Sequence, residues 1–151
     1  MDDNSFGKMA EQMQNMISDG AMGKIKMPPP VFVELGGEIT DVDIDAKTMT
    51  VKFPVEDRFR NPLGFLQGGI LVAMIDNTVG PLSFMLAPPS VTTQFNTSYL
   101  RPVTPQDKFL TIKAVCVEQT RRQLFLQGTA YNMEGKTLCI AQATQQIIDN
   151  R

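Results

Sequence analysis

Residues 67–86 read QGGILVAMIDNTVGPLSFML, a continuous apolar stretch that is too long for one strand and apolar on nearly every face. We therefore predict a buried central helix here. Pro81 lacks the amide that would bond to the carbonyl of Asn77, so the helix is expected to kink or end at Gly80-Pro81. A helix that is apolar all round needs cover on every side, and one curved sheet supplies only part of it. The uncovered side predicts a dimer interface.

Strand-like patterns lie on both sides of this helix. From Gly37 to Pro54 the apolar residues alternate around a turn at 45–47, which indicates a β-hairpin. Residues 55–66 combine turn formers and charges and predict an exposed loop. Four further strand-like segments follow the helix, near residues 91–100, 107–119, 122–132 and 137–148. Because no helical pattern separates them, they are expected to pair antiparallel as a meander, which gives an α+β class with about six strands.

The N-terminal region has a different pattern. Apolar residues at three- and four-residue spacings over residues 6–17 predict a short amphipathic helix, and Pro28-Pro29-Pro30 predicts an extended linker. A chain of 151 residues is near the usual size of one domain. We therefore divide it into residues 1–30, an N-terminal amphipathic helix and Pro-rich linker, and residues 31–151, a single domain.

Charge and composition exclude several classes of partner. A net charge of -2 and a pI near 5.1 offer no basic surface for a phosphate backbone, so nucleic acid is not expected as a partner. The first residues are acidic and polar where a secretory signal would be basic and then apolar, and no run of 18 apolar residues occurs. We expect a cytoplasmic protein without membrane insertion.

The absence of histidine narrows the possible chemistry most. It removes catalysis by Ser-His-Asp and Cys-His pairs, HExxH zinc sites and the zinc deaminases. Cys116 and Cys139 cannot make a four-ligand zinc site, and both lie in alternating patterns where a small buried thiol is the usual interpretation. We predict no metal and no cofactor. In an enzyme, carboxylates, amides, hydroxyls and backbone dipoles would have to carry the chemistry.

Asp76 is the only acid between Arg58 and Gln106, and it lies in the middle of the apolar helix. An ionised carboxylate buried without partners costs several kcal/mol, so hydrogen bonds satisfy it, its pKa rises, or it faces a cavity. One interpretation is a structural aspartate that amides or hydroxyls satisfy. The other, which we favour, is catalytic, because perturbed carboxylates cluster at active sites.

Gln67-Gly68-Gly69 lies where the helix begins. Backbone amides there lack intrahelical partners and the helix dipole is positive, which suits an oxyanion, although a Gly-Gly pair before a helix can also be only a sharp bend. Asp76 follows Gly68 by eight residues, about 12 Å along a helix. Within one chain the two cannot both reach one carbon unless the ligand crosses the helix or a symmetry mate supplies one of them.

Four segments carry the motifs that follow one another along the chain: Asn61-Pro62-Leu63-Gly64-Phe65-Leu66-Gln67-Gly68-Gly69, Asp76-Asn77, Val91-Thr92-Thr93-Gln94 and Tyr99-Leu100-Arg101-Pro102. Their order and spacing resemble those of the PaaI-type hotdog thioesterases, which carry Asn, His-Gly-Gly, a helix acid, a Thr- or Ser-bearing strand and Tyr-x-Arg-Pro. The resemblance covers roughly residues 35–148. It implies a hotdog fold, in which a curved antiparallel sheet wraps a long central helix, and hydrolysis of acyl-CoA-type thioesters by a homodimer or homotetramer.

The resemblance also implies roles for individual residues. The Gly68 amide would polarise the thioester carbonyl, and Asp76 of the other subunit would act as nucleophile or general base. Asn61 would orient the water or the carboxylate, and Thr92 would position the attacking group. Further candidates for substrate binding are Gly69, which lets a ligand approach closely, and four cations for the nucleotide phosphates, Arg101, Lys108, Arg121 and Arg122.

One departure from the family pattern is Gln67, which stands where the family has histidine. An amide can still donate and accept hydrogen bonds, so Gln67 could keep an orienting role. Two alternatives to the thioesterase stay open. One is a non-catalytic protein that binds acyl-CoA or acyl groups, and the other is a hydratase-like or structural hotdog. The sequence leaves open the acyl group, the effect of Gln67 on activity, the choice between dimer and tetramer, and the physiological pathway.

Overall fold

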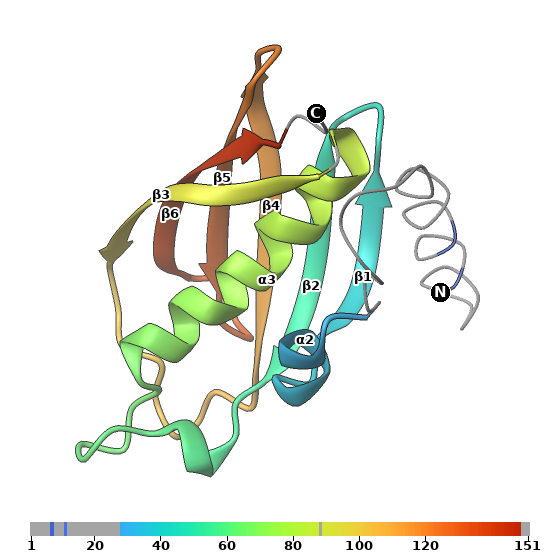
Figure 1. The fold of residues 1–151 in the computed structure, drawn as a ribbon. Coiled ribbons are helices and arrows are strands. Elements are labelled where there is room, and N and C mark those ends of the chain that lie inside the picture. The colour runs from blue at the N-terminus through green and yellow to red at the C-terminus, as the bar shows by residue number, and fades with distance from the viewer. Residues whose placement is uncertain (1–6, 8–10, 12–27, 88, 149–151) are drawn as a thin grey trace.

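The chain folds around one long helix, α3 (Gly68–Leu86), held against a curved six-stranded antiparallel sheet (Figure 1). This computed structural model describes Gly7, Glu11, residues 28–87 and residues 89–148. The arrangement is the predicted α+β hotdog fold. Apart from Gly7 and Glu11, the amphipathic helix predicted over residues 6–17 falls outside the described residues.

The strands follow the order β1-β2-β4-β5-β6-β3 across the sheet. The predicted hairpin is confirmed as β1 and β2, and the predicted meander is confirmed for β4, β5 and β6. The prediction is wrong for β3, which pairs with β6 at the far edge, while β4 returns to pair with β2. The reason is α3, whose 19 residues carry the chain about 28 Å across the sheet before β3 begins. The bounds are β1 (Glu38–Asp43), β2 (Thr48–Pro54), β3 (Ser90–Tyr99), β4 (Phe109–Gln119), β5 (Gln123–Tyr131) and β6 (Thr137–Ile147).

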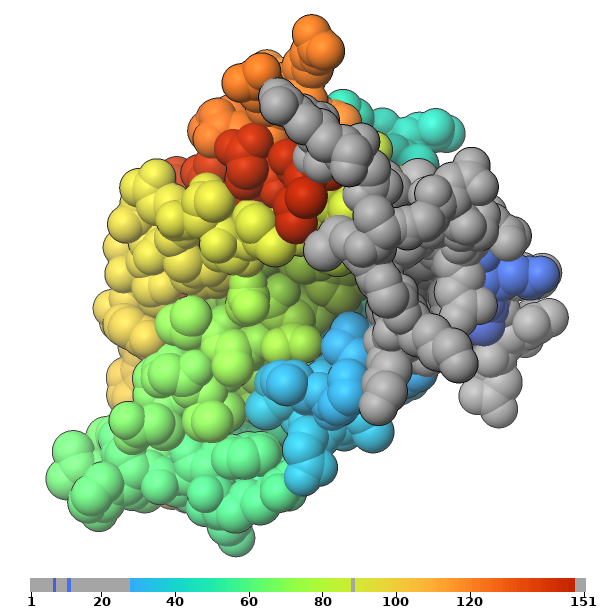
Figure 2. Space-filling model, in the orientation of Figure 1, coloured from blue at the N-terminus to red at the C-terminus, as the bar shows by residue number. Residues whose placement is uncertain are grey.

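One side of α3 forms the centre of the core. Its buried apolar residues recur every three or four positions and face the sheet: Leu71, Met74, Ile75, Val79 and Leu82. The opposite side, with Ala73, Asp76 and Gly80, is half-exposed, and Figure 2 shows part of the α3 surface in green between β3 in yellow and α2 in blue. In length and composition α3 is sufficient to cross a membrane, and it is the only such helix within residues 28–87 and 89–148. In this fold α3 packs against the sheet and forms the centre of the core.

Pro81 does not end the helix, so of the two alternatives predicted at Gly80-Pro81, a kink or an end, the second is wrong. The helix continues to Leu86, and both Pro81 and Leu82 are buried within it. Proline removes one backbone hydrogen bond, but burial of Pro81 and Leu82 in the core offsets that loss. The Ser83 hydroxyl donates to the Gly80 carbonyl at 2.7 Å in the same turn.

A short helix, α2 (Pro30–Glu34), was not predicted from the sequence. Pro29 is extended, as expected of a linker, whereas Pro30 occupies the first helical turn, where proline is well tolerated. Phe32 of α2 is buried and packs edge-to-face on Phe53 of β2 with ring centroids 5.8 Å apart. The packed domain therefore includes this proline-initiated turn.

The segment between β2 and α3 is a loop, as predicted, with local order of its own. It contains the 3-10 helix η1 (Asp57–Phe59) and a bridge between Arg60 and Leu66. Most of it is exposed or half-exposed, but Leu66 is buried at the point where the chain approaches α3. The bridge fixes the approach of the chain to the first turn of that helix.

Both cysteines are buried free thiols, which confirms the interpretation of their strand patterns. Cys116 lies on β4 and Cys139 on β6, with β5 between them. Burial raises the pKa of Cys139 to about 11, so this thiol stays protonated at neutral pH. Both cysteines act as small core residues.

Gly128 of β5 marks the closest approach of α3 to the sheet. A Cβ at this position would overlap the Cγ2 atom of Ile75 and lie 3.4 Å from Val79 Cγ1. We expect Gly128→Ala to lower the free energy of unfolding by roughly 1–3 kcal/mol, because the helix must move away. Gly80→Ala is the control, since a Cβ there meets no atom of the described residues within 4 Å, and it is expected to be neutral or more stable by up to about 1 kcal/mol. Urea unfolding measures both, and equal stability of Gly128→Ala and parent would contradict this packing.

Candidate active site

Asp76 lies on the half-exposed side of α3 and faces the first residues of β3. The Thr92 hydroxyl donates to Asp76 Oδ1 at 3.2 Å, and Gln145 Nε2 of β6 donates to Thr92 Oγ1 at 2.8 Å. Burial raises the pKa of Asp76 above its ordinary value, and the Thr92 hydrogen bond lowers it in part. Asp76 is the only charged residue in α3, β3 and β6. It is therefore a carboxylate poised to hold a proton more readily than a solvated one.

A β-bulge aims Thr92 at this carboxylate. In the β3–β6 ladder Thr92 pairs with Gln145 and Gln94 pairs with Thr144, so Thr93 is the extra residue. Successive side chains of a strand alternate between faces, and Thr92 and Tyr99 are seven residues apart, so regular pairing would place them on opposite faces. The bulge restores them to the same face, from which both reach α3. The geometry of the site therefore depends on this irregularity.

The first turn of α3 presents backbone amides without acceptors. The amides of Ile70 and Leu71 donate to the Gln67 carbonyl, whereas those of Gly68 and Gly69 have no acceptor within the described part of the chain. The Tyr99 hydroxyl donates to the Gly68 carbonyl at 2.9 Å. That bond polarises the peptide group between Gly68 and Gly69, and the dipole of the helix adds positive potential. This end of α3 can bind an anion or a developing oxyanion.

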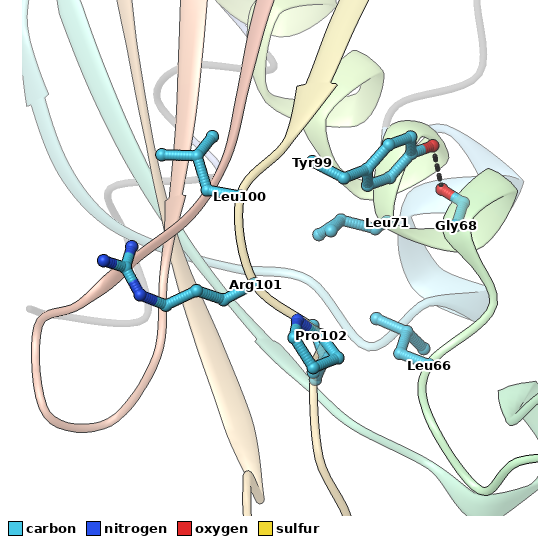
Figure 3. Close-up of a pocket in the computed structure, with 8 residues that line it drawn as sticks. Leu66, Gly68, Leu71, Tyr99, Leu100, Arg101 and Pro102 are labelled. Atoms are coloured by element: carbon cyan, nitrogen blue, oxygen red, sulfur yellow. Dashed lines mark hydrogen bonds between the residues drawn. The ribbon is translucent and has the colours of Figure 1, made fainter.

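A pocket of about 290 Å³ lies beside this turn (Figure 3). The Tyr99 ring closes one side, because a Cβ on Gly68 would lie 3.1–3.3 Å from its hydroxyl and ring atoms. The guanidinium of Arg101 points away from Gly68 and donates to the Thr137 carbonyl at 2.7 Å. The pocket can therefore take an apolar or uncharged group next to the free amides. Its apolar walls are Leu66, Leu71, Leu100, Pro102 and Val103.

The predicted site residues form two clusters within one chain. Asp76 lies with Thr92, whereas Gly68 and Gly69 lie with Tyr99 at the start of the helix, about 12 Å away along its axis. One reacting carbon cannot contact both clusters of the same chain.

Two residues before the helix have structural environments that the motif alone did not reveal. The Asn61 side-chain oxygen accepts from the amides of Leu63 and Phe65 at 2.9 and 3.1 Å, so it orders the loop that leads to α3. Gln67 is the N-cap residue, yet within the described residues its exposed side chain makes no hydrogen bond. Its backbone amide donates to the Phe59 carbonyl and fixes the entry of the chain into the helix.

The four candidate phosphate-binding cations lie at two ends of the sheet. Arg101 and Lys108 precede β4, where Lys108 Nζ donates to the Pro105 carbonyl at 3.3 Å. Arg121 and Arg122 are exposed in the turn after β4. The 11 residues of that strand span about 36 Å. Within one chain these cations cannot share a ligand, and Arg101 alone borders the pocket described above.

Gln145 received no role in the sequence analysis, although the sequence carries a signal for it. In β6 the residues Cys139, Ala141 and Ala143 are buried on one face, and Gln145 continues the same alternation. An amide on the core face of a strand predicts a specific hydrogen-bond partner. The partner itself, Thr92, could not be predicted, because the bulge in β3 sets the register.

Comparisons with known proteins agree on one family. Residues 63–139 match the model of the thioesterase superfamily. A phenylacetic acid degradation-related protein of Ralstonia eutropha JMP134 has 28% sequence identity and a TM-score of 0.76, with 90% of this chain and 99% of that chain covered. No curated protein matches the sequence.

Two further solved structures are similar to this chain. A hypothetical thioesterase of Streptococcus pneumoniae TIGR4, solved with coenzyme A, has 29% identity and a TM-score of 0.70, with 76% of this chain and 88% of that chain covered. The E. coli PaaI protein of the phenylacetic acid degradation operon has 19% identity and a TM-score of 0.76, with 96% of each chain covered. The second likeness shows the shared fold.

Proposed function

Because this chain belongs to the thioesterase superfamily, we propose that it hydrolyses acyl-CoA thioesters to a free acid and CoA. The observation that carries the proposal is the Asp76 carboxylate, which burial keeps basic and which Thr92 orients at the half-exposed surface of the central helix. A carboxylate with a raised pKa is the group that a histidine-free site needs to activate water near neutral pH.

In the proposed reaction Asp76 takes a proton from water, and the water oxygen attacks the thioester carbonyl carbon. The carbonyl oxygen becomes an oxyanion, to which the Gly68 amide donates a hydrogen bond. Collapse of this intermediate breaks the carbon–sulfur bond, and the CoA thiolate leaves with the proton that Asp76 received. Direct attack by Asp76 as nucleophile is the second route, through an acyl-enzyme anhydride that water then hydrolyses.

Two subunits are proposed to build each site. Support comes from the separation of Asp76 and Gly68 in one chain, and from two surfaces that a partner could cover. One is the half-exposed side of α3, and the other is the edge of β3, whose residues are mostly exposed. An exposed edge strand offers unpaired backbone groups to a second copy. Gly68 of one protomer would then face Asp76 of the other, in a dimer or a dimer of dimers.

CoA is proposed to bind through cations of both subunits. The coenzyme A in the similar Streptococcus pneumoniae structure supports this class of ligand. Arg101 and Lys108 would come from the protomer that supplies Gly68, and Arg121 and Arg122 from its partner. Asn61 is proposed to act by ordering the loop next to the thioester, and Gln67 by donating to the substrate. Such an enzyme would act in the cytoplasm, where acyl-CoA is made and used.

A second candidate function is the binding of acyl-CoA without hydrolysis. The observation that favours it is Gln67, which replaces the family histidine and has a side chain that makes no hydrogen bond within the described residues. A site that retains the pocket but fails to orient the thioester would bind and not react.

Thiol release from a panel of short, medium, long and aryl acyl-CoAs separates the two functions. We expect turnover of at least one acyl class, with kcat/KM of roughly 10⁴ M⁻¹s⁻¹ or more for the preferred substrate. Calorimetric binding measured on the same panel is the companion experiment. Tight binding without thiol release on any member would contradict hydrolysis and support the second function.

A further inference from the structure

Gln145 is a core amide at the end of a chain of hydrogen bonds. It is 2% exposed and lies on β6, one strand in from the sheet edge. Its Nε2 donates to Thr92 Oγ1 at 2.8 Å, and Thr92 Oγ1 donates to Asp76 Oδ1 at 3.2 Å. A buried amide costs free energy that an apolar side chain of similar volume does not. Here that amide contacts Thr92, whose hydroxyl is the one donor to the Asp76 carboxylate among the described residues.

The direction of these hydrogen bonds follows from the chemistry of the Gln145, Thr92 and Asp76 side chains. A hydroxyl has one proton to donate and two lone pairs to accept with. The amide nitrogen of Gln145 can only donate, so it occupies a lone pair of Thr92 Oγ1 and leaves the hydroxyl proton free for another acceptor. Asp76 Oδ1 is the acceptor within reach. Gln145 thus selects the orientation in which Thr92 is a donor to the carboxylate.

We propose that Gln145 is a positioning residue for Asp76, because its amide holds the Thr92 hydroxyl in the orientation that donates to the carboxylate. The inference rests on the proposed function, and it extends that function to a side chain with no access to substrate. Gln145 acts on Asp76 through Thr92 alone.

Few titratable groups surround this chain of hydrogen bonds. On β3, β6 and β5 they are Tyr99, Cys139 and Tyr131, and none of them contributes to the pKa shift of Asp76, which comes from burial and from Thr92. Loss of the Thr92 bond leaves burial unopposed and raises the pKa of Asp76 further. The acidic limb of the pH–rate profile then moves to higher pH, because less of the carboxylate is ionised at a given pH.

The test compares Gln145→Met, which keeps the volume and removes the donor, with Gln145→Glu. An ionised glutamate would accept the hydrogen bond of the Thr92 hydroxyl and so remove it from Asp76. The negative charge of the glutamate would raise the pKa of Asp76 further. The readout is a carbon-detected NMR titration of the Asp76 carboxyl in the full chain, with the signal assigned by its loss in Asp76→Asn. Gln142→Met is the matched control, since Gln142 lies exposed on the same strand.

We expect a higher Asp76 pKa in both Gln145 variants and an unchanged one in Gln142→Met. In Gln145→Met kcat is expected to fall roughly five- to tenfold, the effect of about one hydrogen bond, with KM within about twofold of the parent. The acidic limb of the pH–rate profile should move in the same direction as the Asp76 pKa measured by NMR. In a Thr92→Val background, Gln145→Met should change the Asp76 pKa no further.

An unchanged Asp76 pKa in folded Gln145→Met would overturn the inference, whatever happens to activity. A fall in kcat without a movement of the acidic limb would do the same, because it would indicate general damage to the sheet. Full activity of Asp76→Asn would instead contradict the proposed function. The NMR titration would still report whether Gln145 controls the carboxyl, so the two failures are distinguishable.

Discussion

Asp76→Asn is expected to lower kcat/KM for acyl-CoA hydrolysis by roughly 10²–10⁴-fold, the range of a lost general base. The amide keeps the size of the side chain and can still accept from Thr92, so the fold is retained. It cannot take a proton from water. Thiol release with the preferred acyl-CoA measures the loss, and Asp41→Asn, at an exposed position on β1, is the matched control that should stay fully active.

The same substitution should leave the protein at least as stable at neutral pH. Since burial raises the pKa of Asp76, the folded state binds its proton more tightly than the unfolded state does. The stability that this group contributes is present below its ordinary pKa of 3.8 and is lost as the pH rises through the higher folded pKa. Urea unfolding of parent and Asp76→Asn across this window should show that decline only in the parent.

Equal thiol release by parent and folded Asp76→Asn would remove Asp76 from the chemistry. An unstable Asp76→Asn at neutral pH would indicate instead that the carboxylate holds the fold together. Asp76→Asn is therefore expected to have two opposite effects, lost activity and retained or improved stability.

Gly68→Pro is expected to lower kcat by roughly 10²–10³-fold, the cost of one lost oxyanion donor. Gly68 is the first residue of α3, and there proline removes an amide proton that has no helical acceptor. Gln67 has φ -60° and ψ 129°, an extended conformation that suits the residue before a proline. The helix should therefore form normally, which circular dichroism and urea unfolding would verify.

Gly68→Ala separates the amide from the bulk of the new ring. Alanine keeps the N–H but places a Cβ 3.1 Å from the Tyr99 hydroxyl, as the proline would. We expect Gly68→Ala to lose less than about tenfold in kcat, by displacing Tyr99 from the Gly68 carbonyl. If alanine and proline reduce kcat equally, crowding explains the loss and the Gly68 amide is not the donor.

Local patterns were sufficient to predict most of the fold. The long apolar stretch, the hairpin around residues 45–47 and the four later strands follow from periodicity, and the structure has them within a few residues. Strand order was beyond these patterns, because it depends on where α3 delivers the chain. The persistence of the helix through Pro81 was equally hidden, since tertiary burial outweighs a local helix breaker there.

Part of the candidate site could also be proposed from local sequence patterns. Asp76 was identifiable as a lone acid in an apolar helix, and Gly68 as the residue at its start. The contact of Thr92 with Asp76 depends on the bulge at Thr93, for which an isolated strand pattern gives no signal. Gln145 required the register of β6 as well. Asp76 and Gly68 could therefore be proposed from their own helix, and Thr92 from the family resemblance. The contact of Gln145 with Thr92 depends on pairing between strands and was missed.

Gly68 and Asp76 of different subunits are proposed to serve one thioester. A heterodimer of Asp76→Asn and Gly68→Pro subunits, isolated with two different affinity tags, tests it most directly. One of its two sites would combine the intact Gly68 of one chain with the intact Asp76 of the other. We expect this heterodimer to show about half the parental turnover per dimer, although each variant alone is nearly inactive. A heterodimer no more active than the single variants would contradict a site shared between subunits.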